Sequence, residues 1–267
     1  MKIVLTGANG NLAQNFAQQA VGSGLEIVPV VRDSWDQIDQ LMPGADAVLH
    51  AAGDIRTSPK SHPYNYLDSN LITTAQLLEL CVKHSVPRFY FVSSCAVYGD
   101  INSASESQVC HPVSINGKLK KINEDIVEEF CLANDIRFSC FRVFNLFGGN
   151  DRFSIVYYLA RAAKNQTSFS LNNNGLSQRD FIHVSDVAEI ILKMIKANVF
   201  PTHVNVGTGY PTKIADLLDV VKSRYPEIKT HFTFNQEIEY SRADTTLLNE
   251  LIDKSDFISI LEYVNEI

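Results

Sequence analysis

Short apolar runs alternate along the chain with longer segments in which apolar residues recur every three or four positions. The runs have the length and composition of strands that are buried on both faces of a sheet. They lie at 2–6, 25–31, 46–50, 88–92 and 138–143. Segments with helical periodicity lie at 14–21, 70–83 and 118–133, and a short helix and turn fit 34–45. This regular alternation predicts a parallel, doubly wound α/β sheet.

A glycine turn follows the first strand, within the sequence TGANGNLA at 6–13. Gly7 lets the backbone turn sharply, Gly10 leaves room for a pyrophosphate, and Ala13 lets the next helix lie close to the strand. The free N–H groups at the start of that helix carry a partial positive charge, which suits a phosphate. Strand, glycine turn and helix in this order predict a dinucleotide site in a Rossmann-type sheet rather than an ordinary tight turn.

The residues after the next two strands bear on the choice of cofactor. Arg32 and Asp33 follow the second strand, where the adenosine ribose lies in this fold. Arg32 can pair with a 2′-phosphate and so favours NADP, whereas Asp33 keeps NAD as the alternative. A solvated Arg32 at the start of a loop is the third interpretation. Ala51, Ala52 and Gly53 follow the next strand and are small enough for a cofactor to lie across its end.

The pattern loosens after residue 150. Helices fit 155–164, 185–197 and 213–225, a strand fits 179–184 and a turn fits 205–209. Ser185 is the expected N-cap of the helix that it precedes. We therefore expect a dinucleotide-binding domain over 1–150, to which part of 179–207 returns, and a small substrate-binding lobe over 151–267. Ligands of such sheets bind beyond the carboxyl ends of the strands, so the cleft between sheet and lobe is the expected site.

Composition and charge describe an ordinary globular protein, with 267 residues, 45% of them apolar and 20% charged. The net charge of −7 argues against nucleic acid or an anionic membrane as the main partner. No apolar stretch is long enough to span a bilayer, and residues 1–8 lack the shape of a signal peptide. The five cysteines are an odd number without framework spacing. We therefore expect a cytoplasmic protein with neither nucleic-acid nor membrane partners.

Several stretches occur in an order and spacing that are specific to one family. They are TGANGNLA (6–13), DAVLHAAG (46–53), the helix opening at Asn70, VSSCAVYG (92–99), FRVFNLFG (141–148), RDFIHVSDV (179–187) and NVGTG (205–209). Together they resemble the extended short-chain dehydrogenases, in the NAD(P)-dependent epimerase/dehydratase group that acts on nucleotide sugars. The resemblance implies hydride transfer at a sugar carbon, with NADP or NAD as the cofactor.

The resemblance also implies the catalytic residues. Ser94 takes the place of the serine that hydrogen-bonds the reacting sugar oxygen, and Lys120 takes the place of the lysine that holds the nicotinamide ribose. The family's catalytic tyrosine falls on Asn116, with Ser114 and Gly117 fixing the register. Because asparagine cannot give up a proton near neutral pH, we expect slow redox chemistry unless another group substitutes.

Tyr98 and Cys95, both close to Ser94 in the sequence, are the candidates to replace the missing tyrosine as the acid/base. Tyr98 belongs to the family's Val-Tyr-Gly turn and is no obvious replacement. Cys95 and Ala96 stand where the sugar 4,6-dehydratases carry acids, which argues against 4,6-dehydration. A buried, inert thiol is the favoured interpretation of Cys95 over a working one.

The substrate positions match the family only in part. Asn145 and Arg179 correspond to residues that contact the nucleotide diphosphate, and Arg179 is either a bidentate phosphate clamp or part of a surface ion pair. The family's further arginine before 243–245 is not evident. His183 lacks a second histidine or cysteine at ligand spacing, so it is interpreted as structural and no metal is expected.

These observations predict an NAD(P)-dependent epimerase or reductase of a nucleotide-activated keto sugar. The alternative is a non-catalytic dinucleotide-binding protein, a sensor or subunit that has lost the catalytic tyrosine. By analogy with relatives, helices 70–83 and 118–133 would form a homodimer interface. The resemblance further implies cofactor contacts at Asn9, Asn11, Leu12 and Phe144, and substrate contacts at Ser94, Cys95, Asn145 and Arg179.

Overall fold

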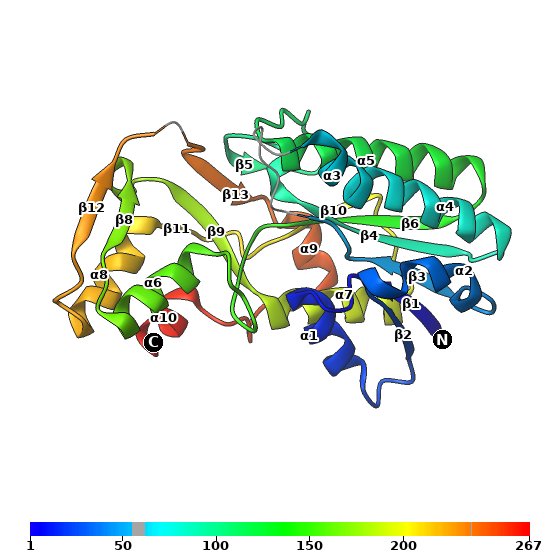
Figure 1. Ribbon diagram of the computed structural model, residues 1–267, viewed down its shortest axis with the longest axis horizontal. Helices are drawn as coiled ribbons and strands as arrows, with labels where there is room; N and C mark the ends of the chain where they lie inside the picture. Colours follow the sequence, from blue (N-terminus) through cyan, green and yellow to red (C-terminus); the bar gives the residue numbers. More distant parts are fainter. Residues whose placement is uncertain (55–61, 236) are drawn as a thin grey trace.

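The structure is a computed structural model that describes residues 1–54, 62–235 and 237–267. Its largest sheet has six strands in the order β10-β6-β4-β3-β1-β2, and all neighbours run parallel (Figure 1). The four residues of β3 are all buried, as the uninterrupted apolar run predicts. The strands of this sheet are β1 (Lys2–Thr6), β2 (Glu26–Val30), β3 (Ala47–His50), β4 (Arg88–Ser94), β6 (Arg137–Val143) and β10 (His203–Val206).

Helices cover both faces of this sheet (Figure 1). Successive side chains of β1 point to opposite faces. Ile3 and Leu5 pack in one core cluster with α1 and α7, whereas Val4 packs in a second cluster with α4 and α5. The predicted doubly wound fold of the Rossmann type is therefore confirmed. The helices of this part are α1 (Asn11–Ala20), α2 (Ile38–Leu41), α3 (Pro63–Leu67), α4 (Thr73–Lys83), α5 (Ile115–Ala133), α7 (Val184–Ala197) and α9 (Thr246–Leu251).

Two helices begin earlier than predicted. α1 begins at Asn11 instead of residue 14, because Gly10 is its N-cap and the helix follows the glycine turn directly. α5 begins at Ile115 instead of residue 118, because the Ser114 hydroxyl accepts a hydrogen bond from the Gly117 amide at 3.0 Å. Position 116 thus lies in the first turn of α5.

Two predictions near the C-terminal half are wrong. Ser185 is not an N-cap, because α7 begins at Val184 and the His183 imidazole accepts a hydrogen bond from the Ser185 amide at 3.2 Å. The predicted turn at 205–209 begins too early, because its first two residues end β10, which pairs with β6 at the edge of the sheet. The domain boundary at residue 150 stays a prediction.

The opposite edge of the sheet is β2. Between β2 and β3 the described chain forms a 3-10 turn (Arg32–Gln37) and α2, with no further strand.

None of the helices in the described residues is long and apolar enough to cross a membrane.

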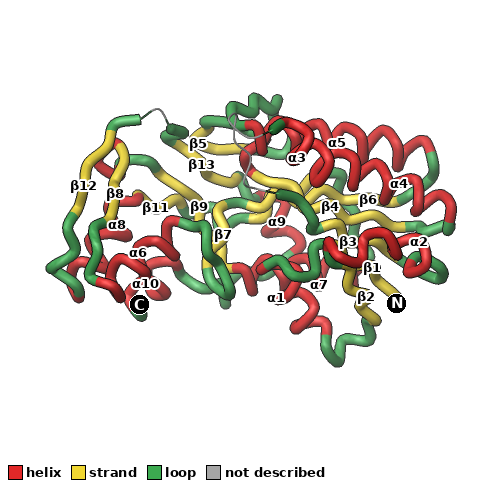
Figure 2. Tube along the Cα trace, viewed as in Figure 1, coloured by secondary structure: helices red, strands yellow, loops and turns green. Residues whose placement is uncertain are grey.

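A second group of strands lies beside the main sheet (Figure 2). One sheet has the order β11-β9-β13-β5, with β7 also pairing with β9, and β8 pairs with β12 separately. Helices α6, α8 and α10 share a core cluster with β8 and β9. The elements are β5 (Ile101–Ala104), β7 (Asn145–Phe147), α6 (Ile155–Asn165), β8 (Phe169–Asn172), β9 (Gln178–His183), β11 (Pro211–Lys213), α8 (Ile214–Arg224), β12 (Thr230–Thr233), β13 (Tyr240–Ala243) and α10 (Ile260–Asn265).

Candidate functional site

The glycine turn between β1 and α1 has the backbone that an anion site needs. Gly7 has φ +69°, and a Cβ there would lie 2.7 to 2.9 Å from backbone atoms of Ala51 and Ala52, so only glycine fits. The Gly10 amide donates to the Gly7 carbonyl at 2.7 Å. No side chain caps the first turn of α1 in the described structure. Its first N–H groups can therefore point at a ligand.

The predicted neighbours of this turn have different environments. Asn9 is exposed, whereas the Leu12 side chain packs in the core and leaves only its backbone for a cofactor. Asn11 binds the loop after β7, because its Nδ2 donates to the Gly148 carbonyl at 2.9 Å and its Oδ1 accepts from the Asn150 amide at 2.8 Å. The turn is thus held against a segment far away in the sequence.

The loop Ala51–Gly53 is fixed by a buried polar chain. The Ala52 amide donates to Thr6 Oγ1 at 3.3 Å, and Thr6 Oγ1 lies 2.7 Å from His50 Nδ1. His50 Nε2 lies 3.0 Å from Thr74 Oγ1. Burial lowers the pKa of His50 to about 3, so its ring is neutral. This neutral ring connects the loop to α4 without adding a charge near the cofactor position.

Arg32 and Asp33 begin the 3-10 turn after β2, and both are exposed. The Ala8 amide donates to the Val30 carbonyl at 3.2 Å, which brings the glycine turn next to the end of β2. Arg32 follows Val30 by two residues, so its backbone lies near the glycine turn, and its side chain is exposed to solvent.

The first turn of α5, which carries Asn116, packs against the turn that follows Ser94 at the end of β4. Ser94 ends β4, and its Oγ accepts a hydrogen bond from the Ala96 amide at 3.2 Å. A Cβ on Gly117 would lie 2.2 Å from the Ala96 carbonyl, so glycine lets the helix contact this turn. Asn116 Oδ1 is buried and has no hydrogen-bond partner in the described part of the chain. Such an acceptor fits a donor group on a ligand.

Lys120 lies one turn further along α5 and is only 8% exposed. Its Nζ donates to the Val92 carbonyl at 2.7 Å and lies 4.7 Å from the centre of the Phe91 ring. Burial lowers the pKa of Lys120 to about 8, although Glu124 acts in the opposite direction. A Cβ on Gly53 would lie 3.6 Å from Lys120 Nζ. The structure therefore places Lys120 directly beside the loop predicted to carry the cofactor.

The side chains of Tyr98 and Cys95 are poor proton carriers here. The Tyr98 hydroxyl donates to Asn205 Oδ1 at 2.7 Å and accepts from Arg142 Nη1 at 2.9 Å, and burial raises its pKa. Burial also raises the pKa of Cys95 to about 11, and its thiol accepts from the Ser241 hydroxyl at 3.6 Å. The geometry favours the inert interpretation of Cys95.

The predicted substrate residues lie on the neighbouring strands. Asn145 Nδ2 donates to the Asp180 carbonyl at 2.9 Å. The Arg179 guanidinium donates to the Ile238 carbonyl at 2.5 Å and to the Glu239 carbonyl at 3.3 Å, and it lies 3.9 Å from the Glu237 carboxylate. Several of its donors are thus already used, and an acid balances its charge.

Phe144 is buried, and its amide donates to the Val206 carbonyl at 3.0 Å. Any contact with a cofactor would therefore come from its backbone. His183 Nδ1 lies 2.6 Å from the Ser185 hydroxyl, in keeping with a structural role. Within the described ranges, no group of three or more His, Cys, Asp or Glu side chains is arranged to hold a metal.

Sequence reasoning missed a buried ion pair behind Lys120. Glu124 is fully buried and accepts hydrogen bonds from Arg142 Nη2 at 2.8 Å and from the Ser93 hydroxyl at 2.5 Å. Burial alone would raise the pKa of Glu124, but the bonds from Arg142 and Ser93 and the nearby His203 lower it to about 2. The signal in the sequence was Arg142 within an apolar strand, since a buried arginine requires an acid.

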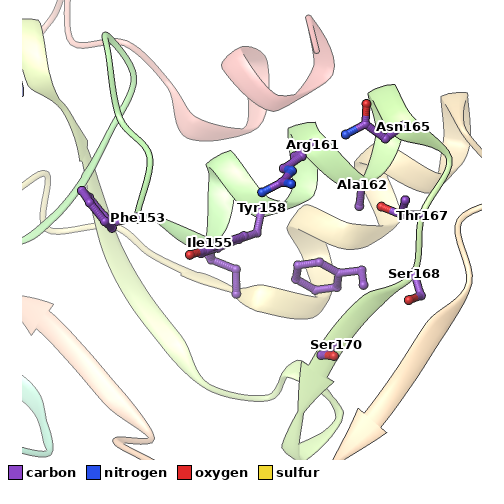
Figure 3. A pocket seen from close by; sticks show the side chains of 10 residues that line it. Phe153, Ile155, Tyr158, Arg161, Ala162, Asn165, Thr167, Ser168 and Ser170 are labelled. Atoms are coloured by element: carbon purple, nitrogen blue, oxygen red, sulfur yellow. The ribbon is translucent and has the colours of Figure 1, made fainter. Parts of the chain in front are cut away.

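A hollow of about 580 Å³ lies beside α6 and β8 (Figure 3). Phe153, Tyr158 and Arg161 line it together with Ser168 and Ser170. Aromatic faces, a guanidinium and hydroxyl groups therefore line one hollow of the second group of strands.

The parallel sheet and the open glycine turn at the start of α1 are the features of a Rossmann-type dinucleotide-binding fold. The chain belongs to the NAD dependent epimerase/dehydratase family, whose model matches residues 3–207. The family resemblance noted in the sequence is thereby confirmed.

The chain is similar to a putative UDP-glucose 4-epimerase of Methanocaldococcus jannaschii, with 29% identity over 187 residues, 66% of this chain and 60% of that protein. It is also similar to a UDP-glucose 4-epimerase of Rhizobium meliloti, with 26% identity over 199 residues, 66% of this chain and 61% of that protein. The chain spans about 60% of the length of such curated relatives.

Among solved structures, the fold is similar to UDP-glucuronic acid 4-epimerase from Bacillus cereus in complex with UDP-glucuronic acid and NAD. The TM-score is 0.91 at 21% identity, and the match covers 99% of this chain and 96% of that one.

Proposed function

We propose that the protein is a nicotinamide dinucleotide-dependent enzyme that acts on a nucleotide-activated sugar, as an epimerase or as a reductase of a keto sugar. The observation that carries this proposal is the position of Lys120, whose Nζ lies beside Gly53 and donates to the carbonyl of Val92, two residues before Ser94 on β4. The relatives are named as epimerases, which favours an enzyme over a non-catalytic sensor.

The described residues fit a dinucleotide. The glycine turn and the first amides of α1 would hold the pyrophosphate, because Gly7 and Gly10 keep side chains away from it. Lys120 would hold the nicotinamide ribose beside Gly53. The bound dinucleotide supplies hydride transfer at a sugar carbon. Ser94 would hydrogen-bond the oxygen on that carbon.

We propose that NADP is preferred over NAD, although several similar solved structures contain NAD. The exposed Arg32 supports this choice, since a charge-assisted bond to a 2′-phosphate contributes about 1.5–3 kcal/mol, or at least ~10-fold in affinity. Titrating both cofactors into wild type, Arg32→Ala and Asp33→Ala tests it, because Asp33 is the residue that would favour NAD. Arg32→Ala should remove the preference, and equal affinities in the wild type would contradict the choice.

Two regions of the second group of strands are proposed to contact the nucleotide part of the substrate. Asn145 and Arg179 remain its proposed contacts, and the aromatic faces and Arg161 of the hollow beside α6 suit a base and a phosphate (Figure 3). Arg161→Ala should weaken binding of a nucleotide sugar about tenfold while dinucleotide affinity stays unchanged. Equal weakening of both ligands would show a general structural effect.

Asn116 provides the test of catalysis. We predict that the wild type transfers hydride slowly and that Asn116→Tyr raises the rate, by up to about 10²–10⁴ where no other group carries the proton. Position 116 lies one helical turn before Lys120, whose ammonium would favour the tyrosinate. Turnover is measured with a panel of nucleotide sugars and their keto forms, alongside thermal stability. A wild type that turns over at ~1–10³ per second would refute the slow-catalyst prediction.

We also propose a homodimer through α4 and α5, where Val82 and Ile122 expose apolar side chains. Sedimentation of the wild type and Ile122→Glu tests it, because the charge should shift a dimer toward monomer. The five cysteines are all free, which supports the expected cytoplasmic location.

A further inference from the structure

The absence of the family's tyrosine leaves open which group takes the proton from the sugar hydroxyl. The inference rests on the proposed function. The described side chains around Ser94 limit which group can accept this proton. A candidate needs a free lone pair, a position at this edge of the sheet and a protonation change within reach of neutral pH. Among the described residues we compare four titratable groups in this region: Tyr98, Cys95, His50 and Lys120.

Three of these groups fail. Tyr98 has its hydroxyl between Asn205 and Arg142, and its raised pKa keeps it protonated. The pKa of Cys95, raised to about 11, keeps its thiol protonated too. His50 has both ring nitrogens engaged, at 2.7 Å from Thr6 Oγ1 and 3.0 Å from Thr74 Oγ1.

The proton positions in the hydrogen-bonded series Thr6–His50–Thr74 can be assigned. Thr74 Oγ1 donates its one proton to the Asn70 carbonyl at 2.8 Å, so it accepts from His50 Nε2. Thr6 Oγ1 then donates to His50 Nδ1. The imidazole is a fixed, neutral Nε2–H tautomer without a lone pair for a substrate.

We propose that Lys120 Nζ is itself the proton carrier of this site, with Asn116 binding the sugar oxygen without exchanging a proton. The amine keeps its bond to the Val92 carbonyl in both protonation states, because it needs only one N–H for that bond. Its lone pair remains for the substrate. Asparagine is also much shorter than tyrosine, so position 116 fills less of the space around Nζ than the family's residue would.

The step balances. The O–H bond of the sugar breaks, an N–H bond forms on Nζ, and the amine becomes an ammonium. The C–O bond would become a carbonyl as the same carbon gives a hydride to the nicotinamide dinucleotide that the proposed function requires. The alcohol would be oxidised and the dinucleotide reduced, and in the reverse direction the ammonium would return the proton.

The surroundings of Nζ allow this titration. Burial favours the amine, while Glu124 on the same helix favours the ammonium. Glu124 is held by Arg142, which reduces its effect. The neutral His50 and the protonated Cys140 face Lys120 from β3 and β6 and add no charge. The resulting pKa of about 8 predicts that sugar oxidation rises with pH and levels off above this value.

The experiment compares wild type, Lys120→Arg and the control Lys118→Arg, an exposed lysine of the same helix. Single-turnover reduction of the bound dinucleotide by a nucleotide sugar is followed from pH ~6 to ~10. Lys120→Arg should lose at least ~10² in rate, since arginine stays protonated, and the control should match wild type. In the Asn116→Tyr background, where tyrosine takes the proton, the same change should cost less than ~10-fold.

A second readout does not depend on turnover or on the folding of a variant. NMR of isotope-labelled lysine gives the pKa of Lys120 in the wild type, which should be near 8 and equal to the kinetic midpoint. A pKa above ~10 would overturn the proposal. So would a folded Lys120→Arg protein with a rate within threefold of wild type.

The remaining outcomes separate this inference from the proposed function. A wild type that binds both ligands but never turns over, while Asn116→Tyr does, overturns the role of Lys120 and leaves the proposed function intact. A wild type and an Asn116→Tyr protein that bind neither NADP nor NAD overturn the proposed function, and the role of Lys120 with it.

Discussion

Replacing Gly10 with valine should remove dinucleotide binding while leaving the fold in place. Gly10 has φ −74° and ψ 153°, an extended conformation that a β-branched residue adopts readily. Gly7 would not allow such a test, because its positive φ and its contact with Ala52 make any side chain strained. A Cβ on Gly10 would meet only the Gly7 carbonyl, at 3.0 Å.

The expected magnitudes differ between stability and binding. Valine is a poorer N-cap than glycine, so the loss of stability should be about 1 kcal/mol. That corresponds to about 2–4 °C in melting temperature for a chain of this size. The branched side chain would stand over the first amides of α1. Losing two charge-assisted bonds to the pyrophosphate, at about 1.5–3 kcal/mol each, weakens binding by ~10²–10⁴.

Calorimetric titration of NADP and NAD into wild type and Gly10→Val measures the effect, with thermal unfolding of both proteins. Gly24→Ala is the matched control. Gly24 has φ +82° with nothing within 4 Å of a Cβ, so the change strains the backbone away from the site. It should lower stability without changing affinity. A folded Gly10→Val protein that binds within threefold of wild type would refute the assignment of this turn.

Two further predictions concern the polar core. Glu124→Gln should remove a stabilisation of about 3 kcal/mol that is present above pH 4.5 and lost as pH falls through about 2, because the folded pKa is depressed. Urea unfolding of both proteins should therefore converge in acid, and a constant difference would contradict the depressed pKa. Asp180→Ala should cost about 3–5 kcal/mol, since the carboxylate accepts bonds from the amides of Thr208, Gly209 and Ala243, and a loss below ~1 kcal/mol in urea unfolding would contradict this role.

Five of the six strands of the main sheet and its two helix layers were predictable, because each of these strands is a short apolar run next to a glycine or a polar turn. The sixth strand, β10, was missed because its sequence, HVNV, is short and half polar. The order of β1, α1 and β2 needs only local information. The boundaries were less predictable, because caps depend on single side chains. His183 replaces Ser185 as the N-cap of α7 since its ring happens to reach the Ser185 amide.

Arg179 illustrates a limit set by long-range contacts. The sequence gives a guanidinium at a position that matches a phosphate contact. Whether its donors are free depends on the segment 237–239, which lies about sixty residues away in the chain and supplies two carbonyls and a carboxylate. The sequence order alone contains no sign of this contact, because it depends on the direct pairing of β13 with β9, two strands far apart in the chain.

The inward face of α5 shows why hydrophobic periodicity could not find the groups behind the site. An apolar stripe that includes Ile122 is the natural choice, yet Ile122 is 44% exposed, and Lys120, Asn123 and Glu124 are buried instead. These polar residues recur at helical spacing and so mark a buried helix face as clearly as apolar residues do. The periodicity identifies this face only if buried polar and charged side chains are counted. Burial of charge is costly unless it is paired, which Arg142 achieves for Glu124. In the part of the chain that the structure describes, Lys120 Nζ contacts the Val92 carbonyl and the Phe91 ring and has no carboxylate bonded to it, so burial lowers the pKa of Lys120 while Arg142 keeps Glu124 charged on the same helix face.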